Sequence, residues 1–390
     1  MSFSQGRPFL AIPGPSPLPD PVIRAMARPS PDIYGPELAG LNARTARQLK
    51  RLAGTGAHLA AYIGNGHAAW EAANANMLNR GERVLVLVSG HFAQSWADNA
   101  EARGIVVERI ESGPAAPDPG QLAERLRQDP AHLIRAVLVC HIDTASSVRA
   151  DIPALRAAMG DHPALLAVDA IASLGCDRLL MDEWGIDVLV SASQKGMMAP
   201  PGMGFVWFSD RARARGRTDL TTPYWEWTAR ADARESWQYW GGTPPVQLVH
   251  ALETALAMLL DDETLPAAWA RHEGLAQATW AAIDAWGAGN PGIAHVVADP
   301  AARARAVTAL TLPGAAGLRA WVQQKAGLTL GIGLGASDPE NAMRIAHMGH
   351  VSAHQHLGTL ATIQAGMQAL DIAHGSGGVE AAASVIARLS

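Results

Sequence analysis

The chain has 390 residues, of which 48% are hydrophobic and 17% charged, and its formal net charge is −5. This composition predicts a globular protein of more than one domain. It has no Lys/Arg-rich run and no apolar run near the ~20 residues of a membrane span, so neither a nucleic-acid partner nor a membrane is expected. Two cysteines, Cys140 and Cys176, provide no disulfide framework, and the N-terminus lacks a signal-like apolar stretch. We therefore expect a cytoplasmic location.

Strand-like apolar runs alternate with alanine-rich helical stretches over about residues 58–210. This alternation is typical of a parallel sheet covered by helices. The expected strands are 58–63, 83–88, 105–110, 136–140, 165–168, 188–190 and 204–208, with helices such as 68–78 and 93–102 between them.

The second half of the chain has a different pattern. Residues 211–240 are rich in Trp and Arg with little periodicity, which predicts an irregular connection. Helices are expected over 246–260 and 265–286, followed by a strand at 306–312 and a terminal helix near 351–370. We expect an N-terminal arm over 1–25, a large domain over 26–264 and a small C-terminal domain over 265–390.

Lys195 is one of three lysines in a chain with 28 arginines. It follows the apolar run 186–190, a predicted buried strand, and precedes a Gly- and Pro-rich loop. An amine in this place can condense with a carbonyl, which a guanidinium cannot do. Taken alone, however, the position is better explained by compositional bias toward arginine and a surface lysine at the end of a strand.

Asp169 directly follows the apolar run 164–168, so its carboxylate is expected at the carboxyl end of a strand, where open α/β sheets bind ligands. Such an aspartate is often only a helix N-cap. Together with Lys195, however, it matches the needs of pyridoxal phosphate. The lysine supplies a Schiff base, and the carboxylate keeps the pyridine nitrogen protonated.

A turn of small residues, Gly-Asn-Gly-His-Ala at 64–68, separates the first predicted strand from its helix. Small residues let backbone N–H groups converge at a helix N-terminus, where the helix dipole favours a phosphate. The turn fits neither the dinucleotide fingerprint nor the P-loop, which argues against the two usual nucleotide sites.

Seven segments in this order resemble the class V (small) pyridoxal-phosphate aminotransferases, in their alanine–glyoxylate and serine–glyoxylate branch. They are Gly-Asn-Gly-His-Ala at 64–68, Ser-Gly-His-Phe at 89–92, His-Ile-Asp-Thr at 141–144, Val-Asp-Ala at 168–170, Ser-Gln-Lys-Gly at 193–196, Thr-Pro-Pro-Val at 243–246 and Arg-Ile-Ala-His-Met-Gly at 344–349. The resemblance implies an α/β protein of fold-type I, like aspartate aminotransferase. Its mostly parallel seven-stranded sheet would carry helices on both faces, beside a smaller C-terminal α+β domain.

The resemblance also implies contacts to the cofactor, and no metal. The implied cofactor-binding residues are Asn65, Gly66, His67, Phe92, Thr144, Asp169, Gln194, Lys195, Trp240 and Thr243. Among them, Phe92 would stack on the ring, and Thr243 would reach the cofactor of a neighbouring subunit, which implies a homodimer with sites at its interface. Trp240 occupies the position of a usual phosphate-binding tyrosine, while Tyr239 precedes it, so either residue can fill this role.

On the substrate side, Arg344 matches the arginine that binds the α-carboxylate, since two parallel N–H donors meet two carboxylate oxygens. Where the family usually has a His-Arg-Ser-Pro-like stretch, this chain has Asp-Ile-Tyr-Gly-Pro at 32–36. That departure makes Tyr34 a candidate substrate contact and leaves the amino donor open.

The resulting prediction is a transaminase in which Lys195 and Asp169 are catalytic. It would move an amino group from a small L-amino acid (serine, alanine or aspartate) to glyoxylate or pyruvate by a ping-pong mechanism. A pyridoxamine–pyruvate aminotransferase stays open as an alternative, because the stretch 141–144 resembles that enzyme too. A lyase or cysteine desulfurase of the same fold ranks lower, because both cysteines fall outside the second domain, where its nucleophile is needed.

Overall fold

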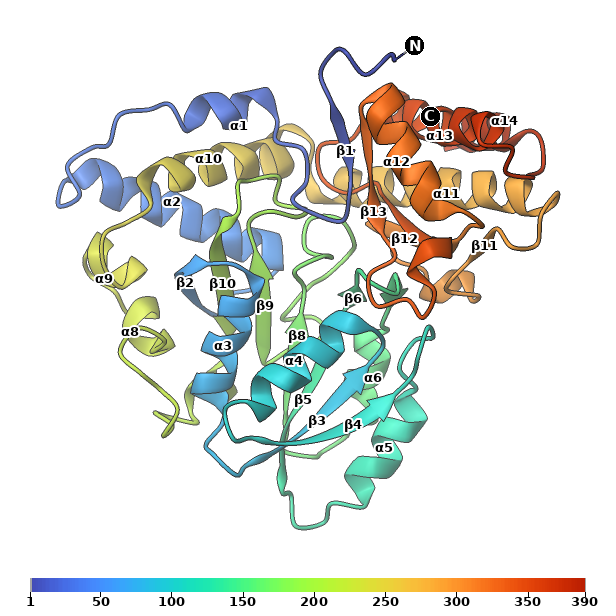
Figure 1. Cartoon of the computed structure of the whole chain (residues 1–390). Helices are drawn as coiled ribbons and strands as arrows, with labels where there is room; N and C mark the ends of the chain where they lie inside the picture. The colour runs from blue at the N-terminus through green and yellow to red at the C-terminus, as the bar shows by residue number, and fades with distance from the viewer. Residues whose placement is uncertain (1, 390) are drawn as a thin grey trace.

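The larger of two main β-sheets has seven strands (Figure 1). A computed structural model describes residues 2–389 of the chain. The strand order is β2-β10-β9-β8-β5-β3-β4, and β10 runs antiparallel to both of its neighbours. The strands are β2 (His58–Gly64), β3 (Arg83–Val88), β4 (Val106–Glu111), β5 (Ile134–Cys140), β8 (Leu165–Asp169), β9 (Val188–Ala192) and β10 (Gly202–Phe208). The expected mostly parallel seven-stranded sheet is confirmed.

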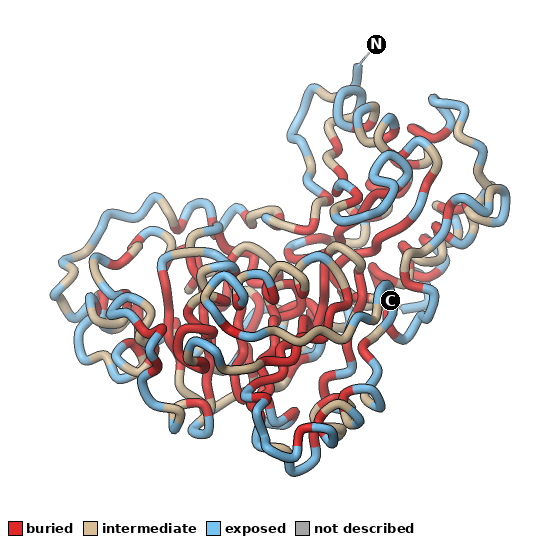
Figure 2. The backbone as a smooth tube through the Cα atoms, turned by 60° about the horizontal axis from the view of Figure 1, so that its bottom comes forward, coloured by how far each residue is buried: buried red, intermediate tan, exposed pale blue. Residues whose placement is uncertain are grey.

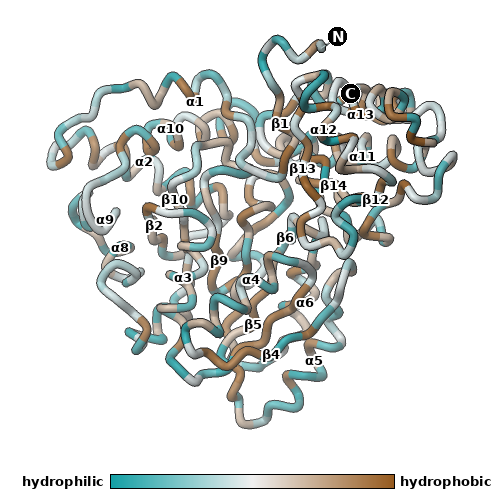
Figure 3. Tube along the Cα trace, in the orientation of Figure 1, coloured by the Kyte–Doolittle hydropathy of each residue, from teal (hydrophilic) through white to brown (hydrophobic). Residues whose placement is uncertain are grey.

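Helices cover both faces of this sheet because its strands are apolar on both sides. On β3, Leu85 and Leu87 face one core cluster, while Val84 and Val86 face the other. The buried strands form the centre of the molecule (Figure 2), and hydropathy marks the same segments (Figure 3). The helices around the sheet are α1 (Asp20–Ala25), α2 (Pro36–Ala53), α3 (Gly66–Met77), α4 (His91–Glu101), α5 (Pro119–Arg127), α6 (Ile152–Ala158) and α10 (Val246–Ala257).

The second sheet has five strands in the order β1-β13-β14-β12-β11. Its strands are β1 (Phe9–Ala11), β11 (Ala294–His295), β12 (Val307–Thr311), β13 (Leu328–Ile332) and β14 (Ala342–Ala346), and its helices are α11 (Leu265–Gly287), α12 (Ala315–Ala326), α13 (Ala353–Ala369) and α14 (Gly378–Leu389). The N-terminal strand β1 lies parallel to β13, with Phe9 opposite Leu328. The first residues of the chain therefore complete a sheet made mostly of its last hundred. A two-stranded hairpin pairs β6 (Ile142–Asp143) with β7 (Val148–Arg149).

Two sequence expectations need correction. The connection 211–240 is not irregular throughout, because it contains α7 (Asp210–Arg213), α8 (Trp227–Ala231) and α9 (Ser236–Trp240). These helices are too short to show a hydrophobic period, and α8 is held by Trp227, whose ring stacks on Phe208 at 4.3 Å. The helix expected near 351–370 is also not the terminal one, since α14 follows it.

The helix expected over 246–260 is α10 followed by a π-helical turn, Met258–Asp262. Short 3-10 turns lie at Pro300–Ala302 and Pro339–Asn341. We propose the domain division at 264/265, where α11 begins. Within the described residues, none of the helices combines the length and the apolar character that crossing a membrane requires.

Candidate active site

A cavity of about 320 Å³ lies at the carboxyl edge of the seven-stranded sheet, at the loops that follow β2, β3, β5, β8 and β9. Parallel strands bring these loops together at one edge. The residues that line the cavity are Gly14, Pro15, Asn65, Gly66, His67, Trp70, Phe92, Ile142, Thr144, Asp169, Ile171, Ala172, Gln194, Lys195 and Pro201. Eight residues that the sequence predicted for cofactor binding are thus collected in one place.

Asp169 ends β8 with its carboxylate buried beneath the cavity. Its Oδ1 accepts a hydrogen bond from the Ile171 N–H at 2.7 Å, and its Oδ2 accepts one from the Trp70 indole N–H at 3.0 Å. Burial raises the pKa of Asp169 to about 7, and these two hydrogen bonds oppose the rise by stabilising the charged form. A carboxyl group of this kind can exchange or share a proton with a ring nitrogen near neutral pH.

Lys195 lies in the turn after β9, and its Nζ donates a hydrogen bond to the carbonyl oxygen of Pro13. Gly14 packs directly on the lysine side chain: a Cβ at this position would lie 2.6 Å from Lys195 Cδ. Burial, and to a smaller extent the positive charge of nearby Arg344, lowers the pKa of Lys195 to about 8. The neutral amine, which is the nucleophilic and basic form, is therefore well populated at mildly alkaline pH.

The turn between β2 and α3 forms the end of the cavity where small residues gather. Asn65 caps α3, since its Oδ1 accepts hydrogen bonds from the N–H groups of His67 at 3.0 Å and Ala68 at 3.3 Å. At Gly66 a Cβ would lie 2.3 Å from Ile171 Cδ1, so any larger residue would displace the Ile171 side chain. Gln194 also lines the cavity, and its Oε1 is buried without a hydrogen-bond partner among the described residues.

These groups fit pyridoxal phosphate. The cavity offers an amine for the aldehyde, a buried carboxyl group for the ring nitrogen, and a helix N-terminus that favours a phosphate. Phe92 is held at its edge because Asp143 Oδ2 accepts the Phe92 backbone N–H at 2.8 Å. Among residues 2–389, no cluster of three or more His, Cys, Asp or Glu side chains is arranged to hold a metal ion.

Arg344 reaches the first sheet from the second. It lies on β14, where its Nε donates to the Ile332 carbonyl at 2.7 Å and its Nη1 to the Thr144 carbonyl at 2.9 Å. Neither acceptor is a carboxylate, and burial lowers the pKa of Arg344 to about 10. Arg344 also lines a wider cleft of about 1080 Å³ that runs between the two sheets. The charge of Asp143 opposes this lowering of the pKa, but the hydrogen bonds of the guanidinium go to backbone carbonyls, so Arg344 beside the cleft is suited to binding an anion.

Besides Arg344, three predicted residues, Trp240, Thr243 and Tyr34, do not line this cavity of their own chain, and neither does Tyr239. Trp240 is buried, and its indole N–H donates to Asn42 Oδ1 at 3.1 Å. The single donor of Trp240 is thus used within the chain, which disfavours a hydrogen bond from Trp240 to the cofactor phosphate. The hydroxyl of Tyr239 is buried without a partner among the described residues. Thr243 and Tyr34 are exposed, the latter at 75%.

Several cavity residues were not predicted from the sequence. Gly14 and Pro15 come from the N-terminal segment, Trp70 from α3 and Pro201 from the loop before β10. Trp70 has the clearest chemical contact, because its indole N–H binds Asp169. Its sequence signal was weak, since a tryptophan on a helix is usually a core residue.

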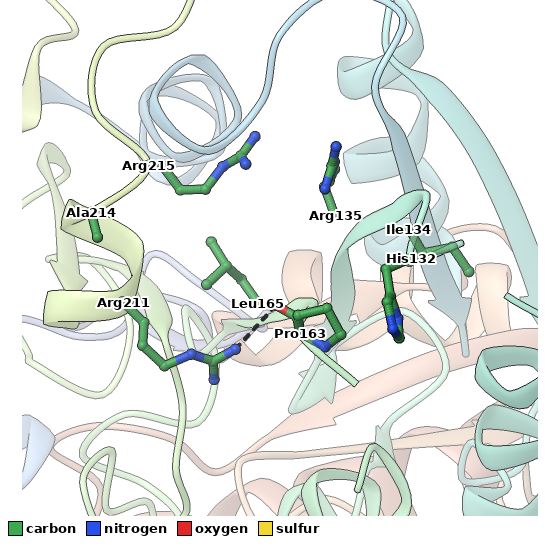
Figure 4. Close-up of a pocket in the computed structure, with 8 residues that line it drawn as sticks. All are labelled: His132, Ile134, Arg135, Pro163, Leu165, Arg211, Ala214 and Arg215. Carbon is green, nitrogen blue, oxygen red and sulfur yellow. Dashed lines mark hydrogen bonds between the residues drawn. The ribbon is translucent and has the colours of Figure 1, made fainter. Parts of the chain in front are cut away.

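A second hollow lies at the opposite edge of the sheet, near the start of β5 and β8 (Figure 4). Three arginines surround it, and each has partners within the chain. Arg215 forms two hydrogen bonds with Glu82, at 2.7 and 2.8 Å, and Arg135 lies 3.4 Å from the same carboxylate. Arg211 donates to Asp187 and to carbonyl oxygens. These interactions indicate a structural cluster that joins the strands to α7.

Comparison with known proteins gives a consistent result. A family model described as aminotransferase class-V matches residues 9–320. A serine–glyoxylate aminotransferase of Arabidopsis thaliana is 33% identical over 377 residues, which cover 93% of this chain and 90% of the relative. An L-aspartate–glyoxylate aminotransferase of Paracoccus denitrificans is 35% identical over 292 residues, with 71% and 70% covered. The crystal structure of a pyridoxamine–pyruvate aminotransferase from Mesorhizobium loti has a TM-score of 0.88 at 25% identity and covers 100% of both chains. The expected fold class is confirmed.

Proposed function

Since the chain belongs to the class V aminotransferase family, which uses pyridoxal phosphate, we propose that it transfers the amino group of a small L-amino acid to glyoxylate or pyruvate. The observation that supports this most is the arrangement around one cavity. Lys195 and Asp169 line it, and Arg344 reaches its Thr144 wall from the second sheet. An amine, a carboxylate that keeps the ring nitrogen protonated and a receptor for the substrate carboxylate are parts that a transaminase needs.

Each residue has a distinct role in this proposal. The cofactor, when bound, supplies an aldehyde and an electron-withdrawing ring. Asp169 keeps a proton on the ring nitrogen, and the turn of Asn65, Gly66 and His67 holds the phosphate. Lys195 Nζ removes the proton from Cα of the amino acid, a task for which its lowered pKa is suited. Arg344 holds the substrate carboxylate.

A ping-pong order of reaction follows from this arrangement. Amino donor and oxo-acid acceptor both carry a carboxylate beside the reacting carbon, and Arg344 is a single receptor for it. The donor must therefore leave as an oxo acid before the acceptor can bind. Serine, alanine and aspartate are the proposed donors, and Tyr34 is a proposed contact at their side chain.

A homodimer with sites at its interface is also proposed. Thr243 is exposed and lies outside the cavity of its own chain, which is consistent with a contact to the partner's cofactor. Large apolar side chains, Ile63, Tyr224 and Trp237, are exposed as well.

A cytoplasmic location is proposed because Cys140 and Cys176 are free and buried.

The second candidate is a pyridoxamine–pyruvate aminotransferase, which the similarity of the Mesorhizobium loti structure favours. The turn at 64–68 opposes it, because a donor without a phosphate leaves this helix N-terminus unused.

A cysteine desulfurase is disfavoured, because burial raises the pKa of the Cys140 thiol well above its usual value and that of Cys176 to about 12. Neither thiol is then an effective nucleophile.

Arg344→Lys separates the two candidates. Single-turnover absorbance of each half-reaction is measured with L-serine, L-alanine, L-aspartate and pyridoxamine as donors. If the donor is an amino acid, the variant slows both half-reactions, because one ammonium cannot replace a two-pronged guanidinium, while the cofactor stays bound. With pyridoxamine as donor, only the oxo-acid half-reaction slows. Turnover of pyridoxamine with no active amino acid would refute the proposed function in favour of the second candidate.

A further inference from the structure

Trp70 is buried beside the cavity at 1% exposure. It lies on α3, and its indole N–H donates to Asp169 Oδ2 at 3.0 Å. Its ring contacts His67 with 4.6 Å between centroids and is stacked on Trp96 at 6.0 Å. The indole is thus fixed on its sides by other rings, and its one donor points at the carboxylate that faces the cavity.

The remaining contacts of Asp169 make this hydrogen bond important. Oδ1 is held by the backbone N–H of Ile171, which no side-chain change removes. Oδ2 has the Trp70 N–H and the Cys140 thiol, and the thiol is 3.7 Å away and a weak donor. Trp70 is therefore the strong side-chain donor to this carboxylate. A hydrogen bond to a charged group is roughly twice as strong as a neutral one.

One helix connects both ends of the cavity. The turn at Asn65 and Gly66 begins α3, and Trp70 follows one helical turn later on the same side. A helix is rigid over a single turn, so α3 sets the distance between its N-terminal turn and the Trp70 indole that binds Asp169.

We propose that Trp70 is a positioning residue, whose indole N–H fixes the orientation and the ionised state of Asp169 toward the ring nitrogen of the cofactor. This inference rests on the proposed role of Asp169. The ionisable groups that influence this carboxylate are Asp143, whose charge opposes its ionisation, Cys140 and Lys195. None of them supplies a short hydrogen bond that would replace the indole.

The test compares Trp70→Phe with Trp96→Phe. Both variants lose a buried indole N–H, but that of Trp96 donates to Asn74 Oδ1 at 3.2 Å and not to Asp169. Trp70→Phe is expected to lower kcat about 10-fold with KM for the amino acid nearly unchanged, and to raise the dissociation constant of pyridoxal phosphate by a similar factor. The acid limb of kcat should move to higher pH, because the carboxylate loses a donor that stabilises its charge.

Because Phe keeps an aromatic ring against Trp70, Trp96→Phe should leave all three measurements near their wild-type values while lowering Tm. Replacing Trp70 by benzothienylalanine, which has sulfur in place of the N–H, keeps the ring shape and should reproduce the Phe result even if the Phe variant folds poorly. If Trp70→Phe or this analogue matches Trp96→Phe in cofactor affinity, kcat and pH profile, the proposal is wrong and Trp70 is only a core residue.

Asp169→Asn distinguishes the inference from the function on which it rests. When Trp70→Phe is added to Asp169→Asn, it should change the single-turnover rate and the cofactor affinity by less than about 2-fold, since coupled residues are non-additive. A full additional 10-fold loss would show that Trp70 acts without Asp169 and would overturn the inference alone. Wild-type affinity and rate in Asp169→Asn itself would instead refute the role of Asp169, and the inference with it.

Discussion

Gly14→Ala is expected to disable Lys195 without removing it. The new methyl group would lie 2.6 to 2.8 Å from three atoms of the lysine side chain, Cδ, Cε and Nζ. Carbon atoms in contact are about 3.5–4.0 Å apart, so the amine must move by about 1 Å. A displacement of this size at a reacting group costs about 10²-fold in rate, or about 2.7 kcal/mol of barrier. Gly14 also has φ +100°, which adds roughly 1–2 kcal/mol of backbone strain for alanine.

Gly113→Ala separates the effect of backbone strain from the effect of the clash with Lys195. Gly113 has φ +60° but nothing within 4 Å of the position of a Cβ, so alanine there brings strain without a clash. Both variants should unfold at lower temperature in a calorimetric scan. Gly14→Ala alone should lose transamination and the visible absorbance of the cofactor bound to Lys195. If Gly14→Ala kept the wild-type kcat and lost only stability, the contact between Gly14 and the lysine would not position the amine.

Three further predictions concern Lys195 and Asp169. Lys195→Ala should lose the visible absorbance and the transamination together, and a variant with the wild-type rate would contradict the assignment. Asp169→Asn should fold but lose about 10²-fold or more in kcat, since an amide does not stabilise the positive charge of a protonated ring nitrogen. Near-normal turnover would show that Asp169 is only a helix cap. Because burial lowers the pKa of Lys195 from 10.5 to about 8, the folded chain binds fewer protons than the unfolded chain between these values. Urea unfolding of the cofactor-free protein should show stability rising with pH across this window, a rise that Lys195→Met should reduce.

Most strands of the large sheet could be predicted because they are buried on both faces and appear as continuous apolar runs, whereas the edge strand β4 has no buried residue. Their ends then placed Lys195 and Asp169. The strand β1 gave no comparable signal. It has three residues, and its partner Leu328 is far away in the sequence. A pairing of this kind depends on the second sheet and not on local preference.

Side-chain contacts were less predictable than positions. Trp240 stands where a phosphate-binding residue was expected, yet Asn42, 198 positions away, accepts its N–H. Trp70 resembles a core residue by sequence, and only the folded chain shows that its N–H faces Asp169. The acceptor of an indole N–H depends on which distant elements pack beside it in the fold, and the hydrophobic periodicity of the sequence does not encode this packing.

The pairing of β1 with β13 has a consequence for synthesis on the ribosome. The last strand of the large sheet ends at Phe208, whereas β13 begins at Leu328, 120 residues later (328 − 208). At ~5–20 residues per second, this interval lasts about 6–24 s. During that time Phe9–Ala11 has no strand to join, and Gly14, which leads from it to the lysine, is not anchored. The large sheet can assemble early, but the wall of the amine site is finished only when nearly the whole chain has been made.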